Sequence, residues 1–331
     1  MSGTLSLPSR LAVGFLDGVC RVLPARLLIG LADVAGTLWY VLAPGRRRVA
    51  RENLRIALGD ELDPGARRRV ARASFRSLAK VFVELAVAGR VLGNADRAAA
   101  RLRYVGAWAE LEADARAGRA GLIVTGHLGN WEMGALAIRR RGVPLAVMAR
   151  PLDWPWLEAA LARRRGGTDV VIPKVGGLKD VLRRLRRGDW VALMSDQNAG
   201  RHGIFVPFFG LEASTFPTPA AVAQRFGVPV YVGTCLRRDG PPCSFDVHMR
   251  RLEPPAADGG PEPRLETVMN AVNEQLEAWI RSAPGQYNWV HRRWKTRPPG
   301  RDASEPGRPR YARSWPIGPD GAPLYGRQPM E

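Results

Sequence analysis

Residues 121–141 read GLIVTGHLGNWEMGALAIRRR, and this stretch decides the fold class. The apolar run Leu122–Val124 predicts a short buried strand, which a glycine-rich turn ends. Asn130 is a favoured helix N-cap, and apolar side chains follow it at helical spacing. The sequence therefore predicts a strand, then a turn that contains His127, then a helix that continues to Arg141.

The same alternation of strand and helix continues through residues 97–297, the predicted catalytic domain. Regular alternation is typical of an α/β fold, so we expect a largely parallel central sheet flanked by helices. An antiparallel arrangement stays open for the final strands. Predicted strands cover 121–126, 144–150, 169–173, 189–196, 228–236 and 244–252, and predicted helices cover 155–165, 176–188, 218–227 and 264–283.

Residues 1–96 are predicted to form an N-terminal helical, membrane-associating region. Residues 11–45 are strongly apolar, but charged residues such as Asp33 interrupt them. The longest uncharged run, 34–45, is shorter than the roughly 18 to 20 residues that a spanning helix needs. The basic start and cleavage site of a signal peptide are also missing. We expect an anchor that lies in the membrane interface and stays in the mature protein.

Basic residues follow this apolar segment. Arg46, Arg48 and their neighbours would meet anionic head groups, which predicts the cytoplasmic face of the inner (plasma) membrane. Asp63 as N-cap and Pro64 at the first helical position then begin an amphipathic helix with a basic flank. For the apolar segment and the arginines after it, the alternative is a buried helix pair followed by a solvated basic turn. For the amphipathic helix, the alternative is a helix docked on the protein surface.

Composition excludes some functions. The net charge is +19, but only four of the 50 basic residues are lysines, and no RNP, zinc-finger or helix-turn-helix signature accompanies the charge. We therefore expect no nucleic-acid partner. Three cysteines without CxxC spacing indicate neither a zinc site nor a disulfide framework. The Pro-, Gly- and Arg-rich residues 298–331 are predicted to be a disordered tail.

Three polar residues lie where predicted strands end. His127 follows the first strand, Arg150 ends the second, and Asp196 ends the strand at 189–196. Ligands of parallel sheets bind at the carboxyl ends of strands, so we expect these side chains to converge there. Singly, each has a structural explanation, as a capping histidine, a solvated arginine or an Asx-turn aspartate.

The spacing of His127 and Glu132 restricts how the two side chains can meet. Residues five apart on one helix lie about 140° apart around its axis, so His127 must lie in the turn and Glu132 in the first helical turn. We then expect Glu132 to accept a hydrogen bond from one imidazole nitrogen. His127 would take a proton from a substrate hydroxyl as a general base, and free N–H groups at the helix N-terminus would stabilise an oxyanion.

The sequence lacks the motifs of several other chemistries. It contains no GxSxG elbow, no HExxH motif and no P-loop, and no cysteine lies near His127. We therefore expect no covalent nucleophile, no metal and no cofactor. Direct acyl transfer to a hydroxyl group fits the residues that are present.

Longer motifs resemble one enzyme family, the late acyltransferases of lipid A biosynthesis. These enzymes transfer lauroyl and myristoyl chains and belong to the lysophospholipid acyltransferase superfamily. The resemblance runs from about residue 25 to residue 298. It rests on GHLGNWE at 126–132, Arg150-Pro151, GLKDVLRRLRRGDWVALMSDQ at 177–197, GIFVPFFG at 203–210 with Ser214 and Thr215 soon after, and APGQYNWVHRRWKTRP at 283–298.

The resemblance implies a glycerol-phosphate acyltransferase-like fold and a membrane-associated enzyme. Such an enzyme moves a fatty acyl chain from acyl carrier protein, or from acyl-CoA, to a hydroxyl of a glycolipid acceptor, without a metal or an organic cofactor. The residues implied for the site are catalytic His127 and Glu132 and substrate-binding Arg150, Asp196, Gly129 and Asn130.

The sequence leaves the acceptor open. Residues 196–200 read DQNAG, where many lipid A enzymes read Asp-x-Asp-Tyr-Gly, and a branch of the family acylates phosphatidylinositol mannosides. A non-catalytic membrane-lipid binder is the alternative of another class. Burial of about eleven methylenes is worth on the order of 9 kcal/mol, so an acyl groove is expected beside His127. Trp131, Met133 and residues 205–209 are predicted to line it, with ordinary core packing as the alternative.

Overall fold

A computed structural model gives the fold of the chain. It describes residues 14, 18–149, 158, 161, 164, 165, 170–173, 176–253, 264–298, 309 and 311. Arg150, most of the predicted helix at 155–165 and most of the tail lie outside the described residues. The division of the chain after residues 96 and 297 stays a prediction.

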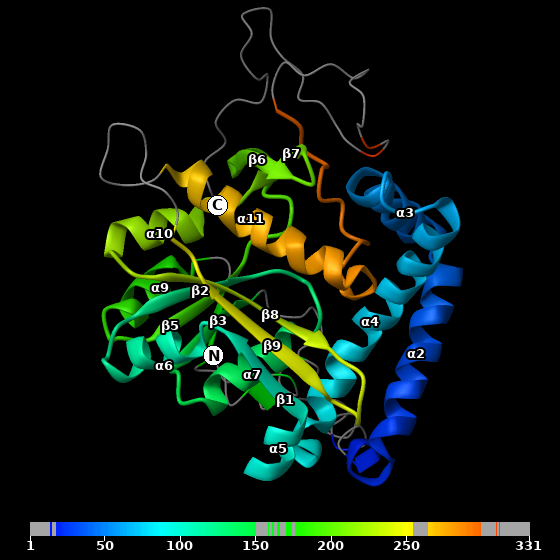
Figure 1. Cartoon of the computed structure of the whole chain (residues 1–331), viewed down its shortest axis with the longest axis horizontal. Helices are drawn as coiled ribbons and strands as arrows, with labels where there is room; N and C mark the ends of the chain where they lie inside the picture. The colour runs from blue at the N-terminus through cyan, green and yellow to red at the C-terminus, as the bar shows by residue number, and fades with distance from the viewer. Residues whose placement is uncertain are drawn as a thin grey trace, which may run out of the picture.

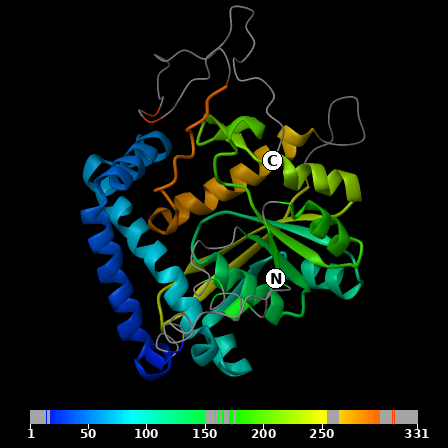
Figure 2. The same cartoon turned by 180° about the vertical axis from the view of Figure 1, so that it is seen from behind.

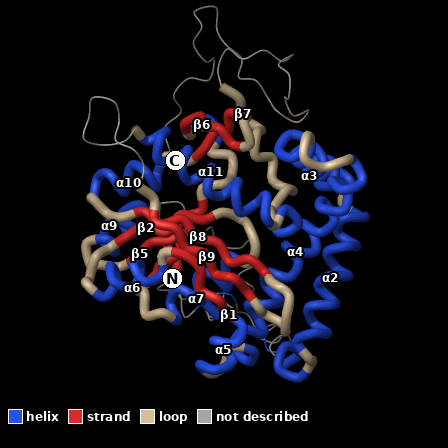
Figure 3. The backbone as a smooth tube through the Cα atoms, in the orientation of Figure 1, coloured by secondary structure: helices blue, strands red, loops and turns tan. Residues whose placement is uncertain are grey.

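A seven-stranded sheet lies at the centre of the molecule (Figures 1 and 3). Its order is β1-β9-β8-β2-β5-β3-β4, and all neighbouring strands are parallel except β8 and β9. The prediction of an α/β fold with a largely parallel sheet is confirmed, and the antiparallel pair is the final one. The strands are Leu102–Gly106 (β1), Gly121–Thr125 (β2), Leu145–Ala149 (β3), Val171–Pro173 (β4), Trp190–Met194 (β5), Val230–Arg237 (β8) and Phe245–Arg251 (β9).

Helices cover both faces of the sheet (Figure 2). Successive side chains of a strand point to opposite faces, so Leu122 and Val124 pack toward α9, α10 and α11, whereas Ile123 packs toward α6 and α7. Both faces are buried, which explains why β2 is a continuous apolar run. The helices are Ala95–Arg101 (α5), Trp108–Arg116 (α6), Trp131–Arg140 (α7), Leu178–Leu185 (α9), Thr218–Phe226 (α10) and Leu265–Ser282 (α11).

Three N-terminal helices lie beside this α/β unit (Figure 1). They are Ala25–Leu42 (α2), Pro44–Leu58 (α3) and Pro64–Val91 (α4). As predicted, Asp63 caps α4, and its Oδ1 accepts the N–H groups of Gly65 and Ala66 at 2.6 and 2.9 Å. Helix α2 packs closely on α4 at Gly36, where an added Cβ would lie 2.5 Å from the Cα of an α4 residue.

The outer face of α2 carries a stripe of exposed apolar side chains, Leu27, Leu31, Val34 and Leu38, which are 48 to 57% exposed. Asp33 lies on the flank of the helix, and Arg76 and Lys80 of α4 contact its carboxylate at 3.0 and 3.1 Å. By length and composition alone, α2 is the one described helix that could cross a membrane.

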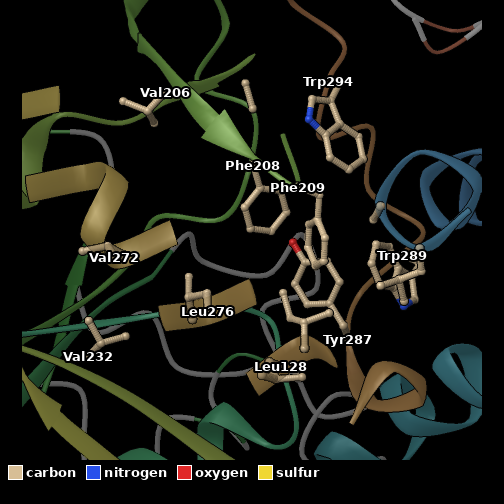
Figure 4. Packing of buried hydrophobic residues seen from close by; sticks show 14 of the residues in the cluster. Leu128, Val206, Phe208, Phe209, Val232, Val272, Leu276, Tyr287, Trp289 and Trp294 are labelled. Carbon is tan, nitrogen blue, oxygen red and sulfur yellow. The ribbon is translucent and has the colours of Figure 1, made fainter. Parts of the chain in front are cut away.

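A separate antiparallel pair, Ile204–Phe208 (β6) and Leu211–Thr215 (β7), packs above α11 (Figure 1). Phe208 and Phe209 lie there against Tyr287 and Trp289 of the C-terminal segment (Figure 4). This aromatic cluster joins the hairpin, α11 and the C-terminal segment into one core.

Candidate active site

His127 and Asp196 lie side by side at the carboxyl edge of the sheet. Strand β2 pairs with β5 so that Thr125 lies opposite Met194, and each site residue comes two positions later in the chain. Asp196 Oδ1 lies 2.8 Å from His127 Nδ1, and Asp196 Oδ2 accepts the main-chain N–H of His127 at 2.7 Å. The parallel register thus brings these two predicted residues together.

Asp196 fixes the hydrogen-bonding roles of the imidazole. Burial alone would raise the pKa of the Asp196 carboxyl, but the charge and hydrogen bonds of His127 and the charge of Arg293 lower it below its ordinary value. An ionised carboxylate only accepts hydrogen bonds, so we assign the hydrogen of the neutral ring to Nδ1. Nε2 then keeps its lone pair, and the side-chain nitrogen of Gln197 lies 3.2 Å from it.

Glu132 does not bind the imidazole, so that expectation is wrong. Its two carboxylate oxygens instead accept hydrogen bonds from Arg165 Nε and Nη2, at 2.8 and 2.5 Å. Both side chains are less than 10% exposed. A guanidinium holds a carboxylate through two parallel, charge-assisted bonds, which are stronger than one bond from a neutral imidazole. Asp196 also already occupies His127 Nδ1.

Arg165 is a site residue that the sequence reasoning did not identify. It is the last of three arginines at 163–165, and nothing in that run of identical residues distinguishes Arg165. Burial lowers its pKa, but the hydrogen bonds and charge of Glu132 outweigh this effect and raise it above the ordinary value. The guanidinium therefore stays charged beside Glu132.

Asn130 is the N-cap of α7, as predicted. Its Oδ1 accepts the N–H of Met133 at 3.0 Å, and its Nδ2 donates to Val81 O at 3.1 Å and to Glu84 at 2.7 Å. The side chain is fully buried and ties α7 to α4. Binding of substrate by Asn130 stays a prediction.

The backbone conformation at position 129 requires a glycine. Its φ is +68°, and an added Cβ would lie 2.0 Å from the carbonyl oxygen of Cys235. The turn can therefore approach β8 only with glycine at this position. Binding of substrate by Gly129 stays a prediction.

Some main-chain N–H groups around the site already donate hydrogen bonds to carbonyl oxygens of the protein. Gly129 N–H donates to Gln286 O, and Asn130 N–H donates to Cys235 O. The first-turn N–H groups of Trp131 and Glu132 have no acceptor within the helix, because the first N–H groups of any α-helix lack one. These two groups are the donors that the helix start offers for the predicted oxyanion.

An apolar cavity of about 670 Å³ opens beside His127. It lies between α7 and the face of the sheet that α7 covers, and its volume is in the range of ligand pockets. The side chain of His127 is 17% exposed. The lining includes His127, Trp131, Gly134, Ile138, Leu145 and Cys235.

Trp131 is the one residue of the predicted acyl groove that borders this cavity, and its ring lies 5.0 Å from the imidazole. Met133 and Phe208 are both 0% exposed and belong to hydrophobic core clusters. For these two residues the alternative of ordinary core packing is correct. The cavity is instead lined mainly by small and apolar side chains, several of them from α7 and from the sheet.

Arg150 lies outside the described residues, so its convergence with His127 and Asp196 stays a prediction. Within the part of the chain that the structure describes, no three His, Cys, Asp or Glu side chains are grouped as ligands for a metal ion.

Comparison with known proteins places this site in a family context. A sequence profile of the bacterial lipid A biosynthesis acyltransferases matches residues 9–296. The lipid A biosynthesis lauroyltransferase of Escherichia coli (strain K12) is 28% identical over 285 residues, which are 84% of this chain and 88% of the relative. The palmitoleoyltransferase of the same strain is 27% identical over 290 residues, with the same coverage. A phosphatidylinositol mannoside acyltransferase of Mycobacterium tuberculosis is 30% identical over 198 residues, 58% of this chain and 60% of the relative.

Proposed function

The chain belongs to the bacterial lipid A biosynthesis acyltransferase family, and we propose that it transfers a fatty acyl chain to a glycolipid hydroxyl with His127 as the general base. One observation carries the proposal. The imidazole is bound through Nδ1 to a buried carboxylate and borders a large apolar cavity. A proton acceptor beside a space for a hydrocarbon chain is what acyl transfer to a hydroxyl requires.

In the proposed reaction, Nε2 of His127 takes the proton of the acceptor hydroxyl while its oxygen attacks the carbonyl carbon of an acyl thioester. The tetrahedral intermediate then expels the thiolate, and the imidazolium returns its proton to the sulfur. Acylated acyl carrier protein and acyl-CoA are both thioesters, and either is a suitable donor. Asp196 holds the ring and stabilises the imidazolium between the two steps.

In this proposal Glu132 does not orient the imidazole of His127, which is the role that its spacing from His127 suggests. It borders the cavity, and its charge is balanced by Arg165. We propose that the pair shapes the polar end of the cavity and that Arg165 holds Glu132 in place. A buried carboxylate without such a partner would be strongly disfavoured.

The cavity is the proposed site of the acyl chain. A chain with about eleven methylenes gains on the order of 9 kcal/mol when it leaves water for an apolar site, at about 0.8 kcal/mol per methylene. Gly134 of α7 and Cys235 of β8 both border the cavity, and their small side chains let α7 pack close to the sheet there.

We propose that the protein binds the cytoplasmic face of the inner membrane through α2. Its exposed residues Leu27, Leu31, Val34 and Leu38 form one face, while the opposite face packs on α4. A helix with only one free face fits an interfacial position better than a span. The Arg76 and Lys80 contacts neutralise Asp33, which removes the obstacle that this carboxylate presents to insertion.

Liposome flotation tests the membrane proposal. We expect wild-type protein to float with vesicles that contain anionic lipid, and a Leu31→Asp, Leu38→Asp double variant to remain with the unbound protein. Ala113→Asp, an equivalent change at an exposed position of α6, is the control and should float. Unchanged flotation of the double variant would show that α2 is not the membrane contact.

A lipid A precursor is the proposed acceptor, because the lauroyl and palmitoleoyl relatives align with 84% of the chain. A phosphatidylinositol mannoside is the second candidate, and the relative that supports it aligns with 58%. Mass spectrometry of membrane lipids from cells with and without the gene identifies the parent lipid and the missing acyl mass.

The variant His127→Ala tests catalysis itself. We expect acyl transfer to fall by about 10²- to 10⁴-fold, while the thermal unfolding midpoint stays close to that of wild type. Near-normal turnover of this variant would exclude His127 as the base. A wild-type protein that binds acyl lipids without any turnover would favour the non-catalytic lipid binder.

A further inference from the structure

Gln197 covers the nitrogen that the proposed reaction uses as the base. Its side chain borders the apolar cavity, and its Nε2 lies 3.2 Å from His127 Nε2. Because Asp196 takes the Nδ1 hydrogen, Nε2 of the neutral ring is an acceptor and pairs with a donor. The NH₂ end of an amide is a donor and its oxygen is not, so the amide nitrogen faces the ring. Gln197 therefore occupies the lone pair on which proton transfer depends.

The main chain around Gln197 is fixed from several sides. Ser195 N–H donates to the carbonyl of the last residue of β2 at 3.1 Å. The Asn198 side chain exchanges two hydrogen bonds with Thr296, at 3.1 and 3.2 Å. Arg293, which is buried, donates from Nη1 to Gln197 O at 3.4 Å. Because the backbone is held in this way, the amide can leave the imidazole only by rotation about its own side-chain bonds.

A base that accepts the proton of an acceptor hydroxyl can also accept a proton from water. In that case the water oxygen attacks the carbonyl carbon of the acyl thioester, and His127 Nε2 takes one of the water protons. The carbon–sulfur bond then breaks, and the imidazolium returns its proton to the thiolate. The products are a free fatty acid and a thiol, and the acyl chain is lost for transfer. A site that prevents this loss must keep water from Nε2 until the acceptor is bound.

Water and a glycolipid differ in what else they bind. To reach His127 Nε2, either molecule must displace the NH₂ group of Gln197. A glycolipid also makes contacts far from its reacting hydroxyl, and the binding free energy of these contacts can offset the lost amide bond. A water molecule has no such contacts. The amide therefore raises the barrier more for hydrolysis than for transfer.

We propose that Gln197 is a specificity-determining residue, whose amide covers His127 Nε2 and gives way to the acceptor hydroxyl but keeps water from the base. This inference rests on the proposed function of His127. One net hydrogen bond between uncharged groups corresponds to roughly two- to tenfold in rate. Loss of the amide should therefore accelerate hydrolysis of the acyl donor by about this factor when no acceptor is present.

The variant Gln197→Met tests this role, because methionine is unbranched like glutamine and cannot donate a hydrogen bond. We expect it to hydrolyse lauroyl-CoA about two- to tenfold faster than wild type without acceptor, measured by release of the thiol. Gln197→Asn, whose shorter side chain keeps the amide but not its reach, should also hydrolyse faster. A purely structural role of Gln197 would instead lower hydrolysis together with transfer.

Gln275→Met is the matched control. Gln275 is also a buried glutamine, and its Oε1 accepts Arg250 Nη1 at 2.6 Å, but it lies on α11 outside the cavity. Hydrolysis by this variant should stay within about twofold of wild type. Addition of His127→Ala to Gln197→Met should remove the gain, because the gain acts through the base. The proposal is overturned if the gain persists in this double variant, or if neither Gln197 variant shows one.

A second readout does not depend on turnover. Diethyl pyrocarbonate carbethoxylates an imidazole nitrogen that carries a free lone pair, and peptide mass spectrometry follows each histidine separately. We expect His127 to react faster in Gln197→Met than in wild type or Gln275→Met, whereas the exposed His202 reacts equally in all three. Equal rates at His127 would also overturn the proposal. Failure of the proposed function would appear instead as near-normal transfer by His127→Ala, whatever the rate of modification in Gln197→Met.

Discussion

Replacement of Asp196 by Asn should invert the hydrogen bonding of the imidazole. In the structure, Asp196 Oδ2 accepts the main-chain N–H of His127 at 2.7 Å and Oδ1 lies 2.8 Å from Nδ1. A carboxamide has one acceptor oxygen and one NH₂ donor. The main-chain N–H can only donate, so the amide oxygen must face it and the NH₂ group must face Nδ1. The ring hydrogen then moves to Nε2, and the base is lost although the site keeps its shape.

The expected loss follows from that inversion. A general base in the wrong tautomer forfeits its rate contribution, so kcat should fall by about 10²- to 10⁴-fold, equivalent to roughly 2.7 to 5.4 kcal/mol in the barrier. A radiolabelled acyl-transfer assay measures this range. Asp114→Asn is the matched control, because Asp114 is also buried and hydrogen-bonded but lies away from the cavity. If Asp196→Asn kept more than a tenth of the wild-type kcat, the assigned tautomer would be wrong.

Two further predictions concern stability. Arg165→Met leaves the buried Glu132 carboxylate without its partner, so the free energy of unfolding should fall by about 3 to 5 kcal/mol. Urea titrations measure this loss. An unchanged midpoint of unfolding would mean that the pair does not stabilise the fold. His291 has a pKa lowered by burial to about 4, so between pH 6.5 and 4 the unfolded chain binds a proton that the folded protein refuses. The contribution of neutral His291 to the free energy of unfolding is therefore fully present above pH 6.5, and it falls by up to about 3 kcal/mol as the pH approaches 4. The variant His291→Asn should lose less stability over that range.

Local chemistry predicted the strand, turn and cap at the site. An apolar run, a glycine-rich turn and Asn130 contain the information for β2 and for the start of α7, and they do not depend on distant residues. The meeting of His127 and Asp196 was predictable as well, because parallel strands place their carboxyl ends at one edge. Spacing along the chain was sufficient for these features.

The partners of Glu132 and His127 could not be read from spacing. The distance from His127 to Glu132 along the chain shows that they can be neighbours, but which partner each binds depends on what else enters the space. Arg165 enters it from a segment whose sequence is a plain run of arginines. The segment 286–288 enters from beyond α11, and its packing on α4 brings its main chain to the turn, where it bonds with His127 and Gly129. Both contacts are long-range, so no local pattern encodes them.

The two carboxylates of the site are set apart by their partners. Glu132 is bound to a guanidinium, which remains charged throughout the physiological range and cannot act as an acceptor, so that pair can hold a position but cannot exchange a proton. Asp196 is bound to an imidazole, whose other nitrogen keeps a lone pair that can accept a proton. We therefore propose that the proton-transfer role belongs to His127 with Asp196, and that loss of charge at Glu132 acts on the shape of the cavity. Glu132→Gln should accordingly change KM for the acyl donor or acceptor at least as much as kcat. A variant with a kcat defect as large as that of His127→Ala and an unaltered KM would return Glu132 to the proton pathway.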